Sequence, residues 1–402
     1  MAFRLPPSSG PRIPAAIWVL GFVSMLMDVS SEAIHALLPI WMVGTLGAST
    51  LAVGLIEGIA EATAAITKVF SGVISDRLGK RKALAALGYG MAAFTKPIFP
   101  LAGSLGWIVA ARFIDRVGKG IRGAPRDALI ADLAPPELRG TAFGLRQTLD
   151  TVGAFVGPLL AIALMAVSGD DVRLVFWVAV VPGFLAFALI VFAVHDPDPA
   201  GAVPARAPPR WAEARRLPAA VWWIVGLGAV FTLARFSDAF LVLRARSVGL
   251  HIMWAPLIMV VMNVVYAAAA YPVGVLADRC DRRVLLVTGL VLLALADATL
   301  AEIATPAGLW IGAVLWGLHM GFTQGLFATL VADAAPADRR GTAFGVFNLV
   351  SGVALLAASV IAGGLWETIG PEATFLAGVG FAVLTLIGTL RLVPAAATDR
   401  RR

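Results

Sequence analysis

The chain is built from one half-length unit that occurs twice. A motif of glycine, aspartate and basic residues begins at Gly72 and returns 202 residues later at Gly274. A second motif, Ala-Asp followed by Arg-Gly-Thr-Ala-Phe-Gly, occurs within 131–144 and again within 332–345, at an offset of 201. Two motifs that recur in the same register indicate an internal repeat. The sequence therefore predicts two halves with the same plan.

The composition places these halves in a lipid bilayer. Of the 402 residues, 59% are hydrophobic and only 14% are charged, and the mean hydropathy is +0.87. This is more apolar than ordinary soluble proteins are. The net charge is +7, but the basic residues form short clusters between apolar runs and do not follow the pattern of a nucleic-acid surface. The single cysteine, Cys280, gives no basis for a disulfide framework, and we expect no cofactor.

About twelve apolar stretches reach the roughly 20 residues that a spanning helix needs. The sequence thus predicts an all-α integral membrane protein with six helices in each half, residues 1–195 and 219–402, joined by a Pro-, Ala- and Arg-rich cytoplasmic linker over 196–218. The predicted spans are 14–42, 48–75, 83–102, 105–126, 141–167, 173–194, 219–243, 250–276, 284–303, 307–332, 342–365 and 372–392.

The distribution of Lys and Arg predicts the orientation. With the N-terminus in the cytoplasm, nearly all basic loop residues fall on the inner side, and only Arg173, Arg244 and Arg246 fall on the outer side. The apolar run that begins near Ile13 has no convincing cleavage site, so we interpret it as an uncleaved first helix. We therefore expect a multi-pass protein of the inner (cytoplasmic) membrane with both termini in the cytoplasm.

Acidic residues inside the predicted spans are the first candidates for function. Asp28, Glu32 and His35 are spaced to share one face of the first helix, and Glu57 and Glu61 repeat the spacing on the second. Charged groups at membrane depth are unfavourable and are therefore functional candidates. Carboxyl groups in a medium of low dielectric constant bind protons more readily, so we predict that these four carboxylates take up and release protons, and they are the candidates for proton coupling. The alternative is that they form structural ion pairs.

A stripe of cationic residues runs down the fourth predicted helix. Arg112, Arg116, Lys119, Arg122 and Arg126 recur at spacings of three or four residues. The last three are expected to reach the cytoplasmic headgroups and to pair with nearby aspartates. Arg112 and Arg116 lie too deep for this, so we predict that they face a cavity.

Further polar residues within the spans are candidates for the wall of a substrate cavity. Such residues face a bundle interior or a water-filled path more often than lipid. The full set of predicted cavity residues is His35, Lys96, Arg116, Arg146, Asp150, Arg235, Asp238, Asn263, Tyr266, His319 and Gln324.

The repeated glycine motif resembles the signature loop of the major facilitator superfamily. The first copy matches at Gly72, Asp76, Arg77, Gly79, Lys80 and Arg81. The second keeps Gly274, Asp278 and Arg279, with Asp281 in place of the glycine. The resemblance covers essentially the whole chain and implies two six-helix halves with the substrate site between them. It also implies that these residues latch the halves, so Asp76→Asn is expected to slow cycling without removing binding.

A stretch of the fifth helix is similar to the antiporter motif of the same superfamily. It carries Gly153, Gly157 and Pro158, with Ala161 where glycine is expected. Small residues four apart also allow close helix packing. The resemblance further implies a role in proton transfer for Arg112, although Arg116 stands where that motif has glycine. The run from Asp115 to Asp132 resembles a bacterial and archaeal permease subgroup, which leaves the cargo open.

The sequence is thus interpreted as a proton-coupled secondary transporter of a small solute that works by alternating access. Export by antiport is preferred, and proton-coupled uptake of an anionic metabolite or metal chelate is the alternative. An ATP-driven pump and a membrane hydrolase are disfavoured, because no phosphate-binding loop, His-Glu-x-x-His or Gly-x-Ser-x-Gly motif is present. We expect a monomer that binds a small solute, protons and lipid. We expect neither enzymatic activity nor binding to nucleic acid.

Overall fold

The computed structural model describes residues 13–78, 80–195, 211–277, 280–323, 326–336 and 339–391. Within these ranges the chain consists of helices and their connections, without strands. A helix satisfies its backbone hydrogen bonds internally, which an apolar run in lipid requires because no water is available there. The predicted all-α membrane fold is confirmed.

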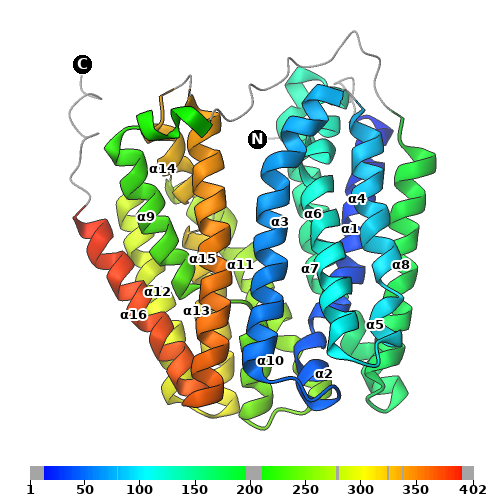
Figure 1. Ribbon diagram of the computed structural model, residues 1–402, viewed down its shortest axis with the longest axis vertical. Coiled ribbons are helices and arrows are strands. Elements are labelled where there is room, and N and C mark those ends of the chain that lie inside the picture. Colours follow the sequence, from blue (N-terminus) through cyan, green and yellow to red (C-terminus); the bar gives the residue numbers. More distant parts are fainter. Residues whose placement is uncertain are drawn as a thin grey trace, which may run out of the picture.

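The first half forms one bundle, at the right of Figure 1. Its elements are α1 (Ala15–His35), α2 (Leu38–Gly44), α3 (Thr50–Leu78), α4 (Arg81–Thr95), α5 (Ile98–Leu101), α6 (Leu105–Leu133), η1 (Pro136–Leu138), α7 (Arg139–Ser168) and α8 (Val172–Ala193).

The second half forms the bundle at the left and centre of Figure 1. Its elements are η3 (Trp211–Arg216), α9 (Ala219–Ala234), α10 (Ala239–Ser247), η4 (Ile252–Trp254), α11 (Leu257–Ala277), α12 (Arg282–Glu302), α13 (Pro306–Thr323), α14 (Leu326–Ala334), α15 (Arg340–Thr368) and α16 (Pro371–Leu390). Of the predicted linker, residues 196–210 lie outside the described part, and the domain boundaries remain predictions.

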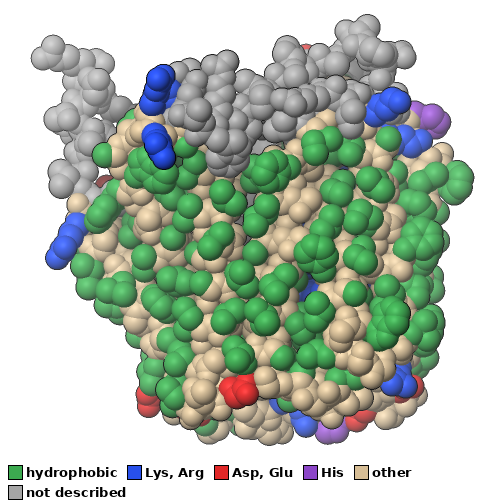
Figure 2. Space-filling model, viewed as in Figure 1, with side chains coloured by type: hydrophobic (Ala, Val, Ile, Leu, Met, Phe, Trp, Pro, Cys, Tyr) green, Lys and Arg blue, Asp and Glu red, His purple; other side chains and the backbone are tan. Residues whose placement is uncertain are grey.

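The helices account for about twelve membrane crossings, as predicted. In the described part of the chain, nine segments are long and apolar enough to span a membrane. The other crossings are interrupted or more polar: α4 ends at Thr95, α6 carries the cationic stripe, and α13 and α14 are separated by residues outside the described part. Figure 2 shows hydrophobic side chains over the middle of the visible face, with charged side chains mainly at its two ends.

Three of the crossings are interrupted helices. Each interruption places polar side chains and irregular backbone inside the molecule. The first crossing turns between α1 and α2, directly after His35. The third turns at Lys96 and Pro97, and proline cannot continue the hydrogen-bond ladder. The seventh turns over 235–238, between α9 and α10. Interrupted helices at membrane depth are tolerated where they line a cavity or are buried in protein.

The two bundles touch closely at the lower end of Figure 1, where α3 packs along α15. Thr50 Oγ1 donates to the Gly363 carbonyl oxygen at 3.3 Å, and Leu51 N donates to Glu367 Oε2 at 3.0 Å. A Cβ atom at Gly363 would lie 2.6 Å from the Thr50 carbonyl oxygen. Glycine is therefore required here for the helices to approach, and this end of the molecule is closed.

Replacing Gly363 with valine is expected to open the closed end. Overpacking of this kind costs about 1–3 kcal/mol, which corresponds to a roughly 5- to 150-fold change in the ratio of two conformations. Double electron–electron resonance between spin labels at Thr45→Cys and Ile369→Cys, in a chain without Cys280, would show that a longer distance becomes populated. Gly364→Val is the control, because its Cβ would meet only Leu51 Cδ1 at 3.9 Å. An unchanged distance distribution for Gly363→Val would contradict the assignment.

Candidate functional site

A cavity of about 480 Å³ lies between the two bundles. Each half contributes to its wall, from α1, α3 and α6 on one side and from α9, α10, α11 and α15 on the other. Lys119 and Asn348 line it and are exposed, which indicates that it is open toward the end opposite Gly363. The lining residues with polar or charged side chains are Glu32, His35, Glu57, Glu61, Arg112, Arg116, Lys119, Thr232, Arg235, Ser237, Asp238, Asn348 and Ser351.

Two ion pairs join α3 to α6 along the first wall. Arg112 binds Glu57, and Arg116 Nη1 lies 3.1 Å from Glu61 Oε1. Both pairs form because residues four apart on each helix share a face. His35 links them, since Arg112 contacts its Nε2 and Arg116 Nη2 lies 2.9 Å from the same atom. These five side chains form one connected network on the cavity wall.

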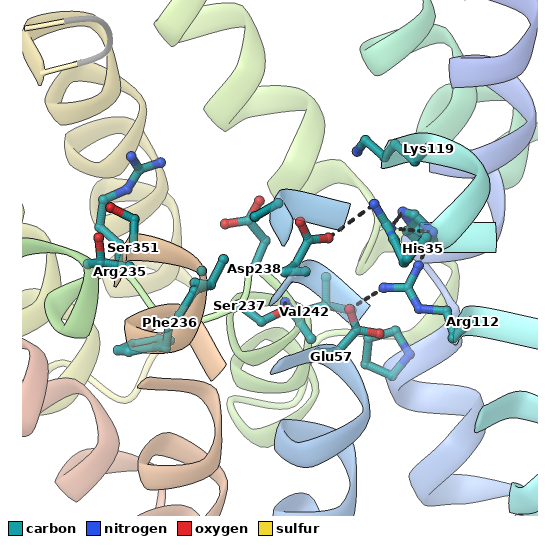
Figure 3. A pocket seen from close by; sticks show the side chains of 18 of the residues that line it. His35, Glu57, Arg112, Lys119, Arg235, Phe236, Ser237, Asp238, Val242 and Ser351 are labelled. Carbon is teal, nitrogen blue, oxygen red and sulfur yellow. Dashed lines mark hydrogen bonds and ion pairs between the residues drawn. The ribbon is translucent and has the colours of Figure 1, made fainter. Parts of the chain in front are cut away.

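Four charged side chains of the wall have no strong partner. Glu32 Oε1 lies 3.7 Å from His35 Nδ1, and Arg235 lies over the Phe231 ring at 5.7 Å. Among the described residues, no group of opposite charge lies within 4.0 Å of Lys119, Arg235 or Asp238. Figure 3 shows Lys119 on one side of the cavity and Arg235 and Asp238 toward the other. These groups are therefore available to a solute.

The lining charges balance each other. The wall contains four carboxylates and four cationic side chains, and two of each are joined in the pairs described above. The available groups are thus two carboxylates and two cations. The members of the unpaired set are Glu32, Asp238, Lys119 and Arg235.

Lys96 lies in a different place from the predicted one. Its ammonium group is fully buried behind the cavity wall, where Nζ donates to Asp115 Oδ1 at 3.0 Å and to Ser31 Oγ at 2.9 Å. Arg116 Nε lies 3.8 Å from Asp115 Oδ2, so the buried pair touches the cavity network. The pair holds α4 against α6 and α1.

Arg146 and Asp150 also belong to a separate cluster. They bind each other one turn apart on α7, and Arg146 Nη1 lies 3.8 Å from Asp127. Asp28 of α1 lies within electrostatic range of Asp150. This cluster is nearer the open end than Glu32 is, because α1 begins and α7 begins at that end.

The glycines of the antiporter-like motif pack against the helix that carries the predicted proton sites. A Cβ at Gly153 would lie 2.9 Å from Asp28 Cβ, and one at Gly157 would lie 2.8 Å from Glu32 Cβ. Pro158 is buried beside them. A shift of α7 therefore displaces α1 at Asp28 and Glu32, because the two helices are in contact there.

The remaining predicted residues are distributed as follows. Asn263 and Tyr266 are partly buried on α11, and Tyr266 lies within electrostatic range of Arg235. His319 is fully buried on α13, with Nδ1 2.8 Å from the Gly289 carbonyl oxygen. Gln324 lies outside the described residues, as do Gly79, Asp278 and Arg279 and the side chains of Asp76 and Arg77.

The described part of the signature loops shows a matched pair of contacts. Arg81 binds Asp132 in the first half, and Arg282 binds Asp333 in the second, each 201 residues later. Lys80 and Gly274 are exposed, and a Cβ at Gly72 would lie 3.5 Å from Ala124 Cβ. The gating role of these residues remains a prediction.

Sequence reasoning missed part of the wall. Lys119 was expected to pair with an aspartate near the headgroups, but it faces the cavity. Phe231, Ser237 and Ser351 carried no charge or motif that would have identified them. The spacing of Lys119 from Arg112 and Arg116, which is that of one helix face, was the signal available.

Two bundles of about six helices around a charged cavity are the architecture of membrane transporters with internal repeats. The chain belongs to the major facilitator superfamily, whose model matches residues 20–262 and 239–402. It is 32% identical over 386 residues to an uncharacterised MFS-type transporter of Methanocaldococcus jannaschii, and 94% of each chain is covered.

Two further similarities are more distant. The chain is 25% identical over 181 residues to the quinolone resistance protein NorA of Staphylococcus aureus, with 45% of each chain covered. A crystal structure of a variant of the nucleoside transporter NupG has a TM-score of 0.78 at 14% identity, covering 93% of this chain and 99% of that chain. At this identity the structural match shows the fold alone.

Proposed function

We propose that this protein is a proton-coupled secondary transporter that exports a small charged solute by alternating access. The observation that carries the proposal is the cavity between the bundles, with available charges of both signs on its wall. Substrate sites of transporters with internal repeats lie at the interface of the repeats near the bilayer midplane. A solute there contacts both halves, and its binding is therefore sensitive to their relative position.

The packing of the halves supports one state of the cycle. With the predicted orientation, the end closed by α3 and α15 is the outer one, and the cavity opens to the cytoplasm. A cytoplasmic solute enters this state directly. The outward-facing state requires that contacts such as the one between Thr50 and Gly363 separate while the opposite ends approach.

Among the predicted proton carriers, the geometry favours Glu32. Glu57 and Glu61 are held by arginines, and Asp28 lies in the cluster near Asp150. Glu32 lines the cavity without an arginine or lysine partner and packs on Gly157 of α7. It is therefore placed to exchange a proton with cavity water and to respond to motion of α7.

Export is favoured over anion uptake by the charge balance. Binding of an anion would be favoured by a surplus of cations on the cavity wall. Two cationic residues predicted to lie there, Lys96 and Arg146, are instead paired with Asp115 and Asp150 away from the cavity. The partial similarity to a quinolone resistance protein is a second, independent support for export.

The test is a flux assay in proteoliposomes that contain an internal pH dye. A quinolone, a cationic dye, an anionic metabolite and a metal chelate are added in turn under an imposed proton gradient. We expect at least one probe to move against the proton flow and to change the internal pH, whereas protein-free liposomes show neither. Co-movement of protons with the anion would establish uptake instead, and solute flux that ignores the gradient would contradict proton coupling.

A further inference from the structure

A buried carboxyl group in the second half has no partner among the described residues. Asp297, on α12, is 0% exposed, and neither of its carboxylate oxygens has a hydrogen-bond partner in this part of the chain. An ionised carboxylate in such a place is strongly disfavoured, because neither water nor a counter-charge compensates its lost hydration. These surroundings therefore favour the neutral form of the side chain, which carries a proton.

The internal repeat shows which residue of the first half corresponds to Asp297. The equivalent ion pairs of Arg81 with Asp132 and of Arg282 with Asp333 fix the offset between the halves at 201 residues in this region. At the same offset, Asp297 is the counterpart of Lys96. The partner of Lys96, Asp115, is replaced by a tryptophan, Trp316, 201 residues later. The second half therefore has an aspartate at the position where the first half has a buried, paired lysine.

The immediate surroundings of Asp297 connect it to the cavity wall. A Cβ at Gly378 of α16 would lie 3.0 Å from Asp297 Cγ and 3.3 Å from Phe236 Cε1. Phe236 lies in the break between α9 and α10 and lines the cavity. Its ring centroid is 5.6 Å from that of Trp316. Phe236 thus lines the cavity and also lies near Asp297, because both side chains pack on Gly378.

The charged groups on the elements packed around Asp297 are engaged elsewhere. Arg244 of α10 donates to the Leu300 and Ala301 carbonyl oxygens of α12 and binds Glu372 of α16 at 3.0 Å. His319 of α13 lies against the Gly289 carbonyl oxygen. On the cavity side, Arg235 and Asp238 flank Phe236 and face the cavity.

We propose that Asp297 is a proton-binding site of the second half and that the segment Arg235–Asp238 controls its access to the cavity. In this state the segment covers the acid, and the proton is retained. When the halves move, Phe236 moves with the cavity wall, and the carboxyl group meets water. Its O–H bond then breaks, the proton passes to water, and the bonding pair stays on the carboxylate. The indole N–H of Trp316, at the position that corresponds to Asp115, has no acceptor among the described residues.

This inference rests on the proposed proton coupling for its role in transport, but the protonation itself is measurable without transport. Infrared spectroscopy of the full-length protein in nanodiscs detects the C=O stretch of a protonated carboxyl group. We expect a band that is absent in Asp297→Asn, persists in mildly alkaline buffer and becomes titratable in Phe236→Ala. Leu293→Ala, one turn away on the same helix and equally buried, is the control and should keep the band unchanged.

The wild-type protein provides a second measurement that does not depend on the folding of a variant. A hydrophobic carbodiimide reacts with protonated carboxyl groups in apolar surroundings, and mass spectrometry locates the adduct. Modification of Asp297 that increases when the protein cycles under a proton gradient supports the proposal. Absence of both the band and the adduct overturns it, and a band that Phe236→Ala leaves untitrated overturns the control of access. Failure of the flux assay with the band present would reject proton coupling alone.

Discussion

Asp115→Asn is expected to destabilise the protein by about 3–5 kcal/mol, because it removes one member of a buried ion pair. The side chains of Lys96 and Asp115 are 1% and 3% exposed, and after the substitution the ammonium group would have only neutral partners, the Ser31 hydroxyl and the new amide oxygen. An unpaired ammonium group at this depth has no water to replace the carboxylate. Denaturant titration of the purified protein in detergent would measure the decrease in the free energy of unfolding.

The double variant Lys96→Met with Asp115→Leu is the control. Replacing a whole buried pair with apolar residues is often neutral or stabilising by about 1–4 kcal/mol, so we expect most of the stability to return. Asp297→Asn, at the position of the second half that corresponds to Lys96, should have a small effect if Asp297 is neutral as proposed, since no ion pair is then broken. Equal destabilisation by Asp115→Asn and by the double variant would contradict the ion-pair explanation.

The sequence predicted the architecture well, because length and hydropathy alone determine which segments cross a bilayer. The spacing of polar residues also predicted which helix faces meet. Glu57 and Glu61 do face Arg112 and Arg116, since each set shares one face of its own helix. The expectation of two halves built on one plan agrees with the repeated Arg-Asp pairs at an offset of 201.

The partner of each charge was less predictable. Periodicity gives the face of a helix on which a residue lies but not the helix that covers that face. Lys96 was expected in the cavity and lies behind it, because its face of α4 is covered by Asp115 of α6 and Ser31 of α1. Lys119 was expected near the headgroups and lines the cavity, because the space beside it is left open between the halves.

The charge difference between the halves has a physical consequence for the cycle. In the first half, Arg112 and Arg116 tie α6 to α3 and therefore stiffen the wall. At the offset of 201, the second half has Ala313 and Gly317 in their places. Both walls contain a broken helix, but the break between α9 and α10 spans four residues, 235–238, whereas the break between α1 and α2 spans two, 36–37. We therefore expect the second half to supply more of the local rearrangement that accompanies transport.

Glu32→Gln is expected to abolish coupling while leaving solute movement intact. For an exchange of one proton per solute, a difference of one pH unit is worth about 1.4 kcal/mol and sustains roughly a tenfold solute ratio across the membrane. A glutamine keeps the size of the side chain but does not exchange a proton. If Glu32 alone carries the coupled proton, the variant brings the solute only to equal concentrations; a ratio that stays above one assigns the remaining coupling to Asp297. The measurement is the steady-state ratio in proteoliposomes, with the membrane potential held at zero by a potassium ionophore and equal potassium on both sides.

Asp238→Asn is the matched control, because it removes the same charge from the opposite side of the same cavity. If Asp238 contacts the solute and Glu32 carries the proton, this variant raises the solute concentration needed for half-maximal flux and keeps the tenfold ratio. The two variants thus separate binding from coupling, although both carboxylates lack a lysine or arginine partner. A tenfold ratio retained by Glu32→Gln and lost by Asp238→Asn would move the proton site to the second half. Asp238, beside the break between α9 and α10, would then be the proton carrier. Glu32, which is proposed for that role because it packs on Gly157 of α7, would not be.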